Sequence, residues 1–280
     1  MHKIKNITRM LFLCITIFAF CGPNTGKISR DLLKQKIVER LNHRSQIIKD
    51  YICEMTTTRL SDSPRGEMKS DMTFRLYKKM PDKRKTEFVE GSRNGEKITK
   101  EDFENFGRSR SGRGRESQPS QLSEKERRPP NGDRRGDRMG RMFGPGFDQE
   151  FDLLKYFADT KIVGSEKLDN VDTYKLSVKI KDQNERLASA TIWLDKATFD
   201  VIKFSGILRK GERIDSGEIT NTYSPVGPEG IYMLAESKSK TLMVFDSPMG
   251  EMEMESVSTS SYKNYQFNQN IADDFFAPEK

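Results

Sequence analysis

The chain has 280 residues, of which 34% are hydrophobic and 32% are charged, and its formal net charge is +7. This length suits one large β domain or two small ones. No Cys/His pair has the spacing of a zinc site, and no histidine follows His43 to act as the base for a serine nucleophile. We therefore expect a protein that is not an enzyme and that has no metal or other cofactor.

The first 21 residues have the pattern of a secretory signal peptide. Lys3, Lys5 and Arg9 precede an apolar run at 10–20, and no acid interrupts it. The run is too short to cross a hydrocarbon core of about 30 Å as a helix. The sequence thus predicts a signal peptide at 1–21. The protein is then exported to the periplasm or the outer-membrane periphery of a Gram-negative-type bacterium.

Two kinds of processing remain open at the end of this segment. Ala19 and Cys21 are small residues that suit an ordinary cleavage site. Alternatively, Cys21 becomes the lipid-modified first residue of a lipid-anchored protein, although the bulky Phe20 before it departs from the usual lipidation pattern.

An amphipathic helix is expected over residues 28–48, followed by strands. Its apolar residues recur at helical spacing, at Ile28, Leu32, Leu33, Ile37, Leu41 and Ile48. From residue 51 the period changes to two, which predicts strands at 51–60, 67–79 and 85–89. Cys53 lies in the first strand, and we expect it to be a buried apolar residue rather than a reactive thiol.

The segment 107–146 interrupts the foldable sequence. Residues 107–142 hold ten Arg and one Lys against five acids, a net charge of +6, in runs of Arg, Gly, Ser and Pro. Since residues 1–21 carry +3, the rest of the chain has a net charge of −2. This composition predicts a basic, disordered insert. Three roles stay open for residues 107–142: a passive linker, attachment to an anionic membrane or an envelope polyanion, and nucleic-acid binding, which export disfavours.

After the insert, residues 151–157 predict a short helix, and the rest of the chain predicts strands and turns. The expected strands lie at 161–167, 173–181, 187–194, 201–209, 216–223, 233–245, 251–257 and 262–267. Many strands joined by short turns predict an antiparallel meander that closes toward a barrel or half-barrel.

Apolar residues alternate on one side of many of these strands. At 251–255, for example, two methionines point to one face and three glutamates to the other. One interpretation is an ordinary core sealed by helix 28–48; the other is a concave face that takes an acyl chain, for which flexible methionines are suited. The candidate ligand-binding residues of this face are Met72, Phe74, Leu76, Phe88, Leu153, Leu154, Phe157, Ile192, Leu194, Ile202, Phe204, Leu208, Met252 and Met254.

Several segments, taken in order, point to a known family. After the leader and the helix come Tyr51-Ile-Cys-Glu-Met-Thr56, Met72-Thr-Phe-Arg-Leu-Tyr77, residues 163–176, Ala190-Thr-Ile-Trp-Leu-Asp195 and residues 262–276. In this order they resemble the outer-membrane lipoprotein-sorting proteins, the LolA/LolB-like carriers, over most of residues 35–100 and 150–278.

The resemblance implies a mainly β fold. It is an antiparallel half-open β-barrel, with an N-terminal helix and a short helix that lids the concave face. The barrel would form one domain at 28–278, interrupted by 107–146, with Trp193 and Asp195 marking a strand and its turn and 262–265 in the closing strand. Two features depart from the family: an insert of this size, and the absence of a match for the buried arginine that tethers the lid in the sorting carrier.

Carriers of this family shield lipoprotein acyl chains as they cross the periplasm. The resemblance therefore implies a non-enzymatic protein that binds lipid or lipoprotein acyl chains, in outer-membrane lipoprotein sorting. An alternative is a structural or regulatory envelope module that uses the same fold to bind another protein, and a third is a hydrolase that uses a pair of carboxylates. The sequence predicts neither the identity of the ligand nor the oligomeric state.

Overall fold

A computed structural model of the chain describes residues 28–64, 66–103, 153–211, 214–247 and 250–277. The chain divides into two compact units, residues 1–35 and residues 36–280. The predicted signal peptide with Cys21, the basic insert at 107–146 and residue 278 lie outside the described residues. Within the described ranges, no helix combines the length and apolarity needed to cross a membrane.

The predicted helix is present as α2 (Arg30–Ile47). Ser29 caps it, because the Ser29 hydroxyl accepts a hydrogen bond from the Leu32 amide at 3.2 Å. In the second unit, Arg40 donates two hydrogen bonds to the Asp200 carboxylate, at 2.9 and 2.5 Å. Ile48, which follows the helix, packs against the buried Ile231 and Met233. The end of the helix is thus fixed to the connections before β8 and β10.

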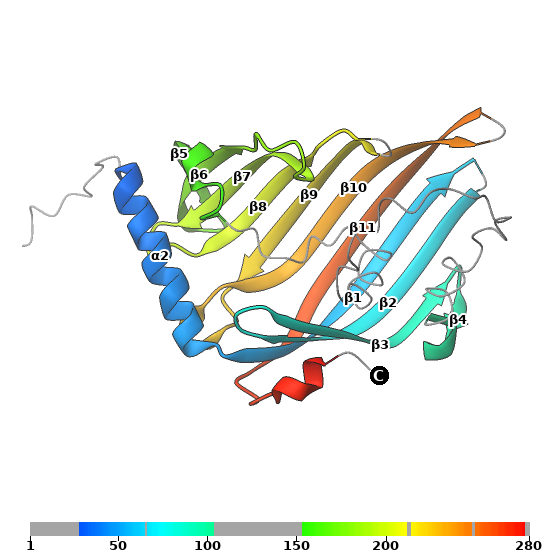
Figure 1. Cartoon of the computed structure of the whole chain (residues 1–280), viewed down its shortest axis with the longest axis horizontal. Coiled ribbons are helices and arrows are strands. Elements are labelled where there is room, and N and C mark those ends of the chain that lie inside the picture. The colour runs from blue at the N-terminus through cyan, green and yellow to red at the C-terminus, as the bar shows by residue number, and fades with distance from the viewer. Residues whose placement is uncertain (1–27, 65, 104–152, 212–213, 248–249, 278–280) are drawn as a thin grey trace, which may run out of the picture. The chain divides into compact units, whose positions relative to one another are not determined.

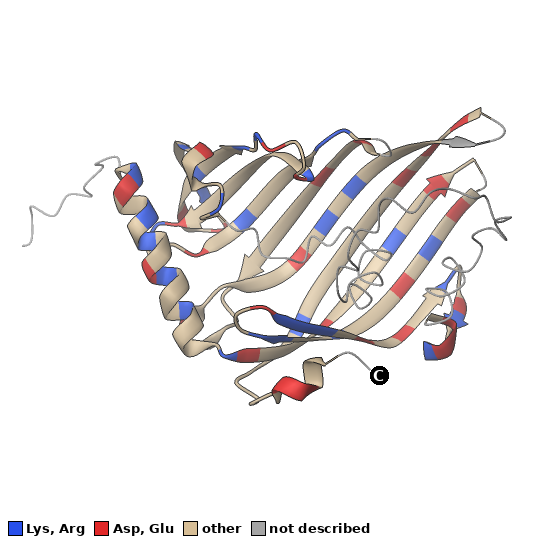
Figure 2. Cartoon of the chain, in the orientation of Figure 1, with Lys and Arg blue, Asp and Glu red and all other residues tan. Residues whose placement is uncertain are grey.

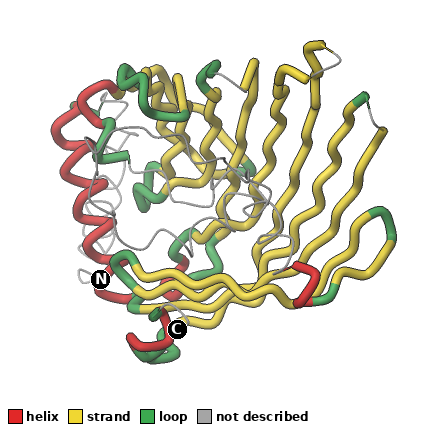
Figure 3. The backbone as a smooth tube through the Cα atoms, turned by 45° about the vertical axis from the view of Figure 1, so that its right-hand side comes forward, coloured by secondary structure: helices red, strands yellow, loops and turns green. Residues whose placement is uncertain are grey.

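All strands belong to one antiparallel sheet in the second unit, in the order β4-β3-β2-β1-β11-β10-β9-β8-β7-β6-β5 (Figure 1). The strands are β1 (Asp50–Ser63), β2 (Gly66–Lys79), β3 (Lys83–Arg93), β4 (Glu96–Ile98), β5 (Thr160–Leu168), β6 (Val171–Lys179), β7 (Leu187–Asp195), β8 (Val201–Leu208), β9 (Ile214–Ser224), β10 (Met233–Ser247) and β11 (Gly250–Phe267). The short 3-10 helices are η1 (Phe157–Asp159), η2 (Pro228–Gly230) and η3 (Asp273–Phe276). β4 and β5 end the sheet, so it stays open, and its strands bend along their length (Figure 3).

The mainly β, antiparallel prediction is confirmed, and four elements differ from it. The strands predicted at 251–257 and 262–267 are one strand, β11, because the hydroxyl-bearing residues between them pair with β1 on one side and with β10 on the other. The predicted helix at 151–157 is wrong in its described part, which is a turn followed by η1. β4 and a helical turn at 100–103 were not predicted.

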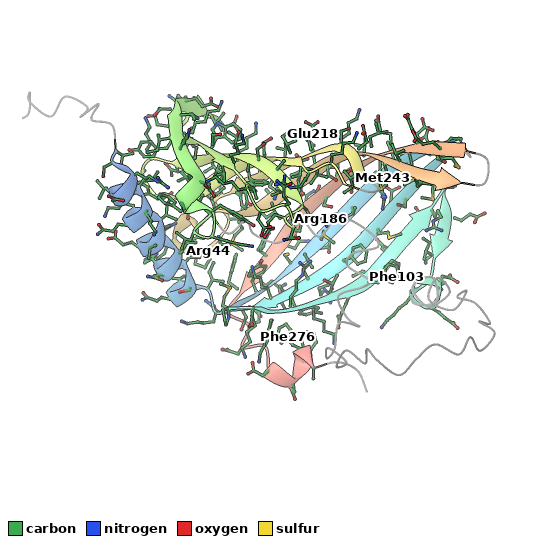
Figure 4. All side chains as sticks on the ribbon, turned by 45° about the horizontal axis from the view of Figure 1, so that its top comes forward. Arg44, Phe103, Arg186, Glu218, Met243 and Phe276 are labelled. Atoms are coloured by element: carbon green, nitrogen blue, oxygen red, sulfur yellow. The ribbon has the colours of Figure 1, made fainter. Side chains whose placement is uncertain are left out.

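The two faces of the sheet differ in charge. Along the central strands, charged residues alternate with uncharged ones (Figure 2). We call the face that carries the buried apolar side chains the inner face, and the other the outer face. Figure 4 labels Met243, on the inner face of β10, and Glu218, on the outer face of β9.

Candidate ligand-binding face

An aromatic cluster occupies the inner face of β2 and β3. Phe74, Phe88 and Phe103 pack together, and the rings of Phe88 and Phe103 stack with centroids 4.6 Å apart. Phe103 reaches the cluster from the helical turn at 100–103, which Thr99 and Asp102 cap reciprocally: each backbone N–H donates to the other side chain, at 3.0 and 3.1 Å. Phe103, which the sequence did not single out, therefore covers two of the predicted residues.

A pocket of about 330 Å³ adjoins this cluster, between apolar and charged side chains. Its walls include Met72, Phe103, Arg93 and Lys97. Of the residues predicted to bind a ligand, Met72 is the one that lines it. The volume is at the lower end of the range for small-molecule sites.

The inner face of β6–β9 forms a closed apolar interior. Leu176, Ile192 and Phe204 face one another across adjacent strands and are 0–3% exposed. The other predicted residues of this region are also buried, namely Leu194, Ile202, Leu208, Leu153 and Phe157, whereas Leu154 is half-buried. This part of the face agrees with the sealed-core interpretation, and a ligand reaches it only if covering side chains move.

The far end of the β10–β11 hairpin is apolar but less enclosed. Met243 lies opposite Met254, and Phe245 lies opposite Met252, all on the inner face. Met252 is 8% exposed, and the other three side chains are half-buried. The alternation noted at 251–255 thus places both methionines as expected, and the structure adds two large apolar partners from β10.

Between the apolar regions, a belt of hydroxyl side chains crosses the inner face. We call these residues the hydroxyl belt: Thr57 and Ser61 of β1, Ser256, Ser258 and Ser260 of β11, and Ser237, Ser239 and Thr241 of β10. Thr57 and Ser260 share a hydrogen bond of 2.8 Å, and Ser61 and Ser256 lie 3.4 Å apart. The inner face is therefore polar at its centre, at residues that the sequence analysis did not single out.

Arg59 lies within this belt. Its Nε donates a hydrogen bond to the Ser256 hydroxyl at 2.9 Å, and burial lowers the pKa of its guanidinium. The sequence contained a sign of the belt, since every second residue of 256–260 is serine, but only the register of β1 against β11 places Arg59 among them.

Cys53 lies at the other end of the inner face, in a cluster with Leu76 and Tyr262. It is 2% exposed, and burial raises the pKa of its thiol to about 11. The prediction of a buried apolar cysteine is confirmed. Its neighbour Tyr265 donates its phenolic hydrogen to the Leu234 carbonyl at 2.6 Å, which satisfies that partly buried hydroxyl.

The outer face offers little to an acyl chain. A pocket of about 220 Å³ there is lined by Leu60 and Val257 together with three acids. No group of three or more His, Cys, Asp or Glu in the part of the chain that the structure describes is arranged to hold a metal.

No protein-family model and no curated protein sequence matches the chain. It is similar to the solved structure of a putative outer membrane lipoprotein-sorting protein domain from Vibrio parahaemolyticus, with 14% identity, 87% of this chain and 97% of that chain covered, and a TM-score of 0.43. A LolA superfamily protein from Nitrosomonas europaea has 13% identity, the same coverages and a TM-score of 0.40. In the Pseudomonas aeruginosa MucA/MucB complex, the matched chain has 10% identity, coverages of 79% and 93%, and a TM-score of 0.22. The family that the sequence resembles is thus among these structures, but the likenesses are too distant to transfer a function.

Proposed function

We propose that this protein binds the acyl chain of a lipid or lipoprotein on its inner face, without catalysis, in a bacterial cell envelope. The observation that carries the proposal is the less enclosed apolar end of the β10–β11 hairpin, where Met243, Phe245 and Met254 are half-buried. Each CH₂ group moved from water onto such a surface gains about 0.8 kcal/mol. Methionine side chains also adapt to chains of different length and shape.

The place of action in this proposal comes from the sequence. The signal peptide predicted at 1–21 would export the chain, and the resemblance to lipoprotein-sorting carriers favours the periplasm or the outer-membrane periphery. Two finer points belong to the same proposal: helical elements lid the inner face, and the basic residues 107–142 attach the protein to an anionic membrane or envelope polyanion.

The test is a titration of a fluorescent fatty acid, 11-dansylaminoundecanoic acid, into the chain without residues 1–21. We expect saturable binding that the double variant M243Q/M254Q weakens about tenfold, because two half-buried apolar contacts contribute about 1.4 kcal/mol together. Leu242→Gln is the matched control, since Leu242 is also half-buried on β10 but lies on the outer face. Absence of binding by the wild-type chain, or equal weakening by the control, would contradict the proposal.

A second function, binding of another protein, is favoured by β5. This strand ends the sheet, and its Ile162 and Val163 are 36% and 54% exposed. An edge strand with exposed apolar side chains can accept an extended peptide as a further strand. A wild-type chain that binds no fatty acid would favour this function over the first.

A further inference from the structure

The inner face of the four central strands carries a cation without an acidic partner. Within 54–62, 67–76, 236–245 and 251–260, every Asp and Glu alternates onto the outer face. Arg59 lies on the inner face in this region, and among the described residues it forms no ion pair. It is half-buried, and desolvation by the surrounding protein lowers its pKa.

Arg40 shows how the same chain treats another arginine of low exposure. Its side chain is 16% exposed, and it makes a two-pronged contact with Asp200 that raises its pKa. Buried charges in proteins are normally paired in this manner, because an unpaired charge loses its hydration without compensation. Among the described residues, the side-chain hydrogen bond of Arg59 is the one from Nε to Ser256, and its side chain lies on the inner face of the sheet.

The neighbours of Arg59 are hydrogen-bonding groups that suit an oxyanion. Ser258 and Ser70 lie directly opposite it on the two adjacent strands, and both are 9% exposed. Ser239 extends this row on the far side of Ser258. A guanidinium fork with hydroxyl donors on both sides has the chemistry that recognises phosphate and carboxylate groups.

The same row connects Arg59 to the pocket beside the aromatic cluster. Arg93 pairs with Ser70 on the side of β2 that faces away from Arg59. Since neighbouring strands are about 4.8 Å apart, the Cα atoms of Arg59 and Arg93 are separated by about 10 Å. Arg93 lines the pocket with the apolar Met72 and Phe103, but the pocket also holds Lys97 and the two acids Glu96 and Asp102. The cation without an acid beside it is therefore Arg59, and the pocket supplies apolar contacts within the length of one amphiphile.

We propose that Arg59 and the hydroxyl belt bind the oxyanion head of an amphiphile, while its tail lies on the apolar parts of the inner face. This inference rests on the proposed binding of acyl chains and specifies their chemistry: the ligand has a phosphate or carboxylate head. The belt divides the inner face so that the polar head finds its partners at the centre of the sheet and the tail extends toward an apolar end.

The experiment compares palmitate with hexadecanol, two single-chain amphiphiles of equal chain length with and without a negative charge, on the chain without residues 1–21. We expect the wild-type chain to bind both, and Arg59→Gln to weaken palmitate binding about tenfold while leaving hexadecanol binding unchanged. Arg59→Lys keeps the charge and should restore part of the loss. Arg75→Gln is the control, because Arg75 is an exposed arginine on the outer face of β2.

Two outcomes would overturn the assignment while leaving acyl-chain binding intact: palmitate binding that Arg59→Gln does not change, and an equal loss for palmitate and hexadecanol. Binding of inorganic phosphate at Arg59 without binding of either amphiphile would show a site for a free anion instead. A wild-type chain that binds neither amphiphile would overturn the proposed function itself, whether or not it binds phosphate.

Discussion

At the scale of single residues, the contact between Arg40 and Asp200 attaches the C-terminal half of α2 to the β7–β8 connection. Asp200 also lies next to Thr198, whose hydroxyl accepts a hydrogen bond from the Asp200 amide at 3.3 Å. Since Asp200 is 6% exposed, its carboxylate has lost most of its hydration, and the Arg40 guanidinium compensates for most of that loss. The helix therefore contributes an ionic anchor as well as an apolar face.

We predict that Asp200→Asn lowers the free energy of unfolding by about 2 kcal/mol, because the variant leaves a partly buried guanidinium without its counter-charge. Urea denaturation followed by circular dichroism measures the change. Lys36→Gln provides the comparison, since it breaks the exposed pair of Lys36 with Glu39 on the same helix and should cost less than about 1 kcal/mol. Equal losses in the two variants would show that the Arg40 contact is no stronger than a surface pair.

The sequence shows why burial was easier to predict than the polar centre of the face. Phe74, Ile192 and Phe204 lie in segments where apolar and polar residues alternate, so that the apolar side of each strand is evident from the sequence. All three are buried on the inner face. Thr57 and Arg59 also alternate, but a polar residue at every second position gives no sign of which face it occupies. That assignment depends on pairing with β11, in which Ser260 lies 203 residues after Thr57.

At the scale of elements, β11 differs most from its prediction. A strand is recognised in a sequence by apolar or β-branched residues on one face, and Ser256–Ser261 has almost none on its inner side. In the sheet these residues are stabilised from outside the strand, by backbone pairing with β1 and β10. The strand is therefore continuous because it pairs with β1 and β10, and its own sequence does not indicate this pairing.

This continuity predicts the cost of a proline at Thr259, a half-buried residue on the outer face of β11. Thr259→Pro should destabilise the protein by about 3 kcal/mol or more, because it removes an N–H from a strand that has neighbours on both sides. Thr259→Ala keeps that N–H and should cost about 1 kcal/mol or less. Thermal and chemical unfolding of the two variants measure the difference, and equal stabilities would indicate a break in the strand between 257 and 262.

At the scale of the whole molecule, the predicted insert separates β4 from β5, which lie at opposite ends of the sheet. We predict that deletion of 107–142 changes the free energy of unfolding by less than about 2 kcal/mol, since the composition of this segment predicts disorder and shortening a disordered connection alters its closure entropy only slowly. Differential scanning calorimetry of the deleted and full chains tests this. A fall of the thermal midpoint by more than about 10 °C would show that residues 107–142 contribute to the folded domain.

The mainly β class and the positions of most strands were predictable, because period-two alternation and turn residues are local features. The predicted meander agrees with the sequential pairing of β1 to β4 and of β5 to β11. The pairing of β1 with β11 was not predictable, because nothing local to Leu60 indicates that it pairs with Val257. The candidate binding face follows the same division: its apolar residues were predictable, whereas the hydroxyl belt, Arg59 and the covering Phe103 arise from contacts between distant segments.

The pairing of β1 with β11 also sets the order in which the molecule can be made. A chain that is delivered from its N-terminal end presents β1 early, but the strand that separates β1 from β10 arrives only with residues 250–267. Until then β1 and β10 each keep an open edge, and such edges invite pairing with other chains. The sheet can therefore be completed only after β11 is present, and a chain truncated before residue 250 is expected to keep two open edges that favour aggregation.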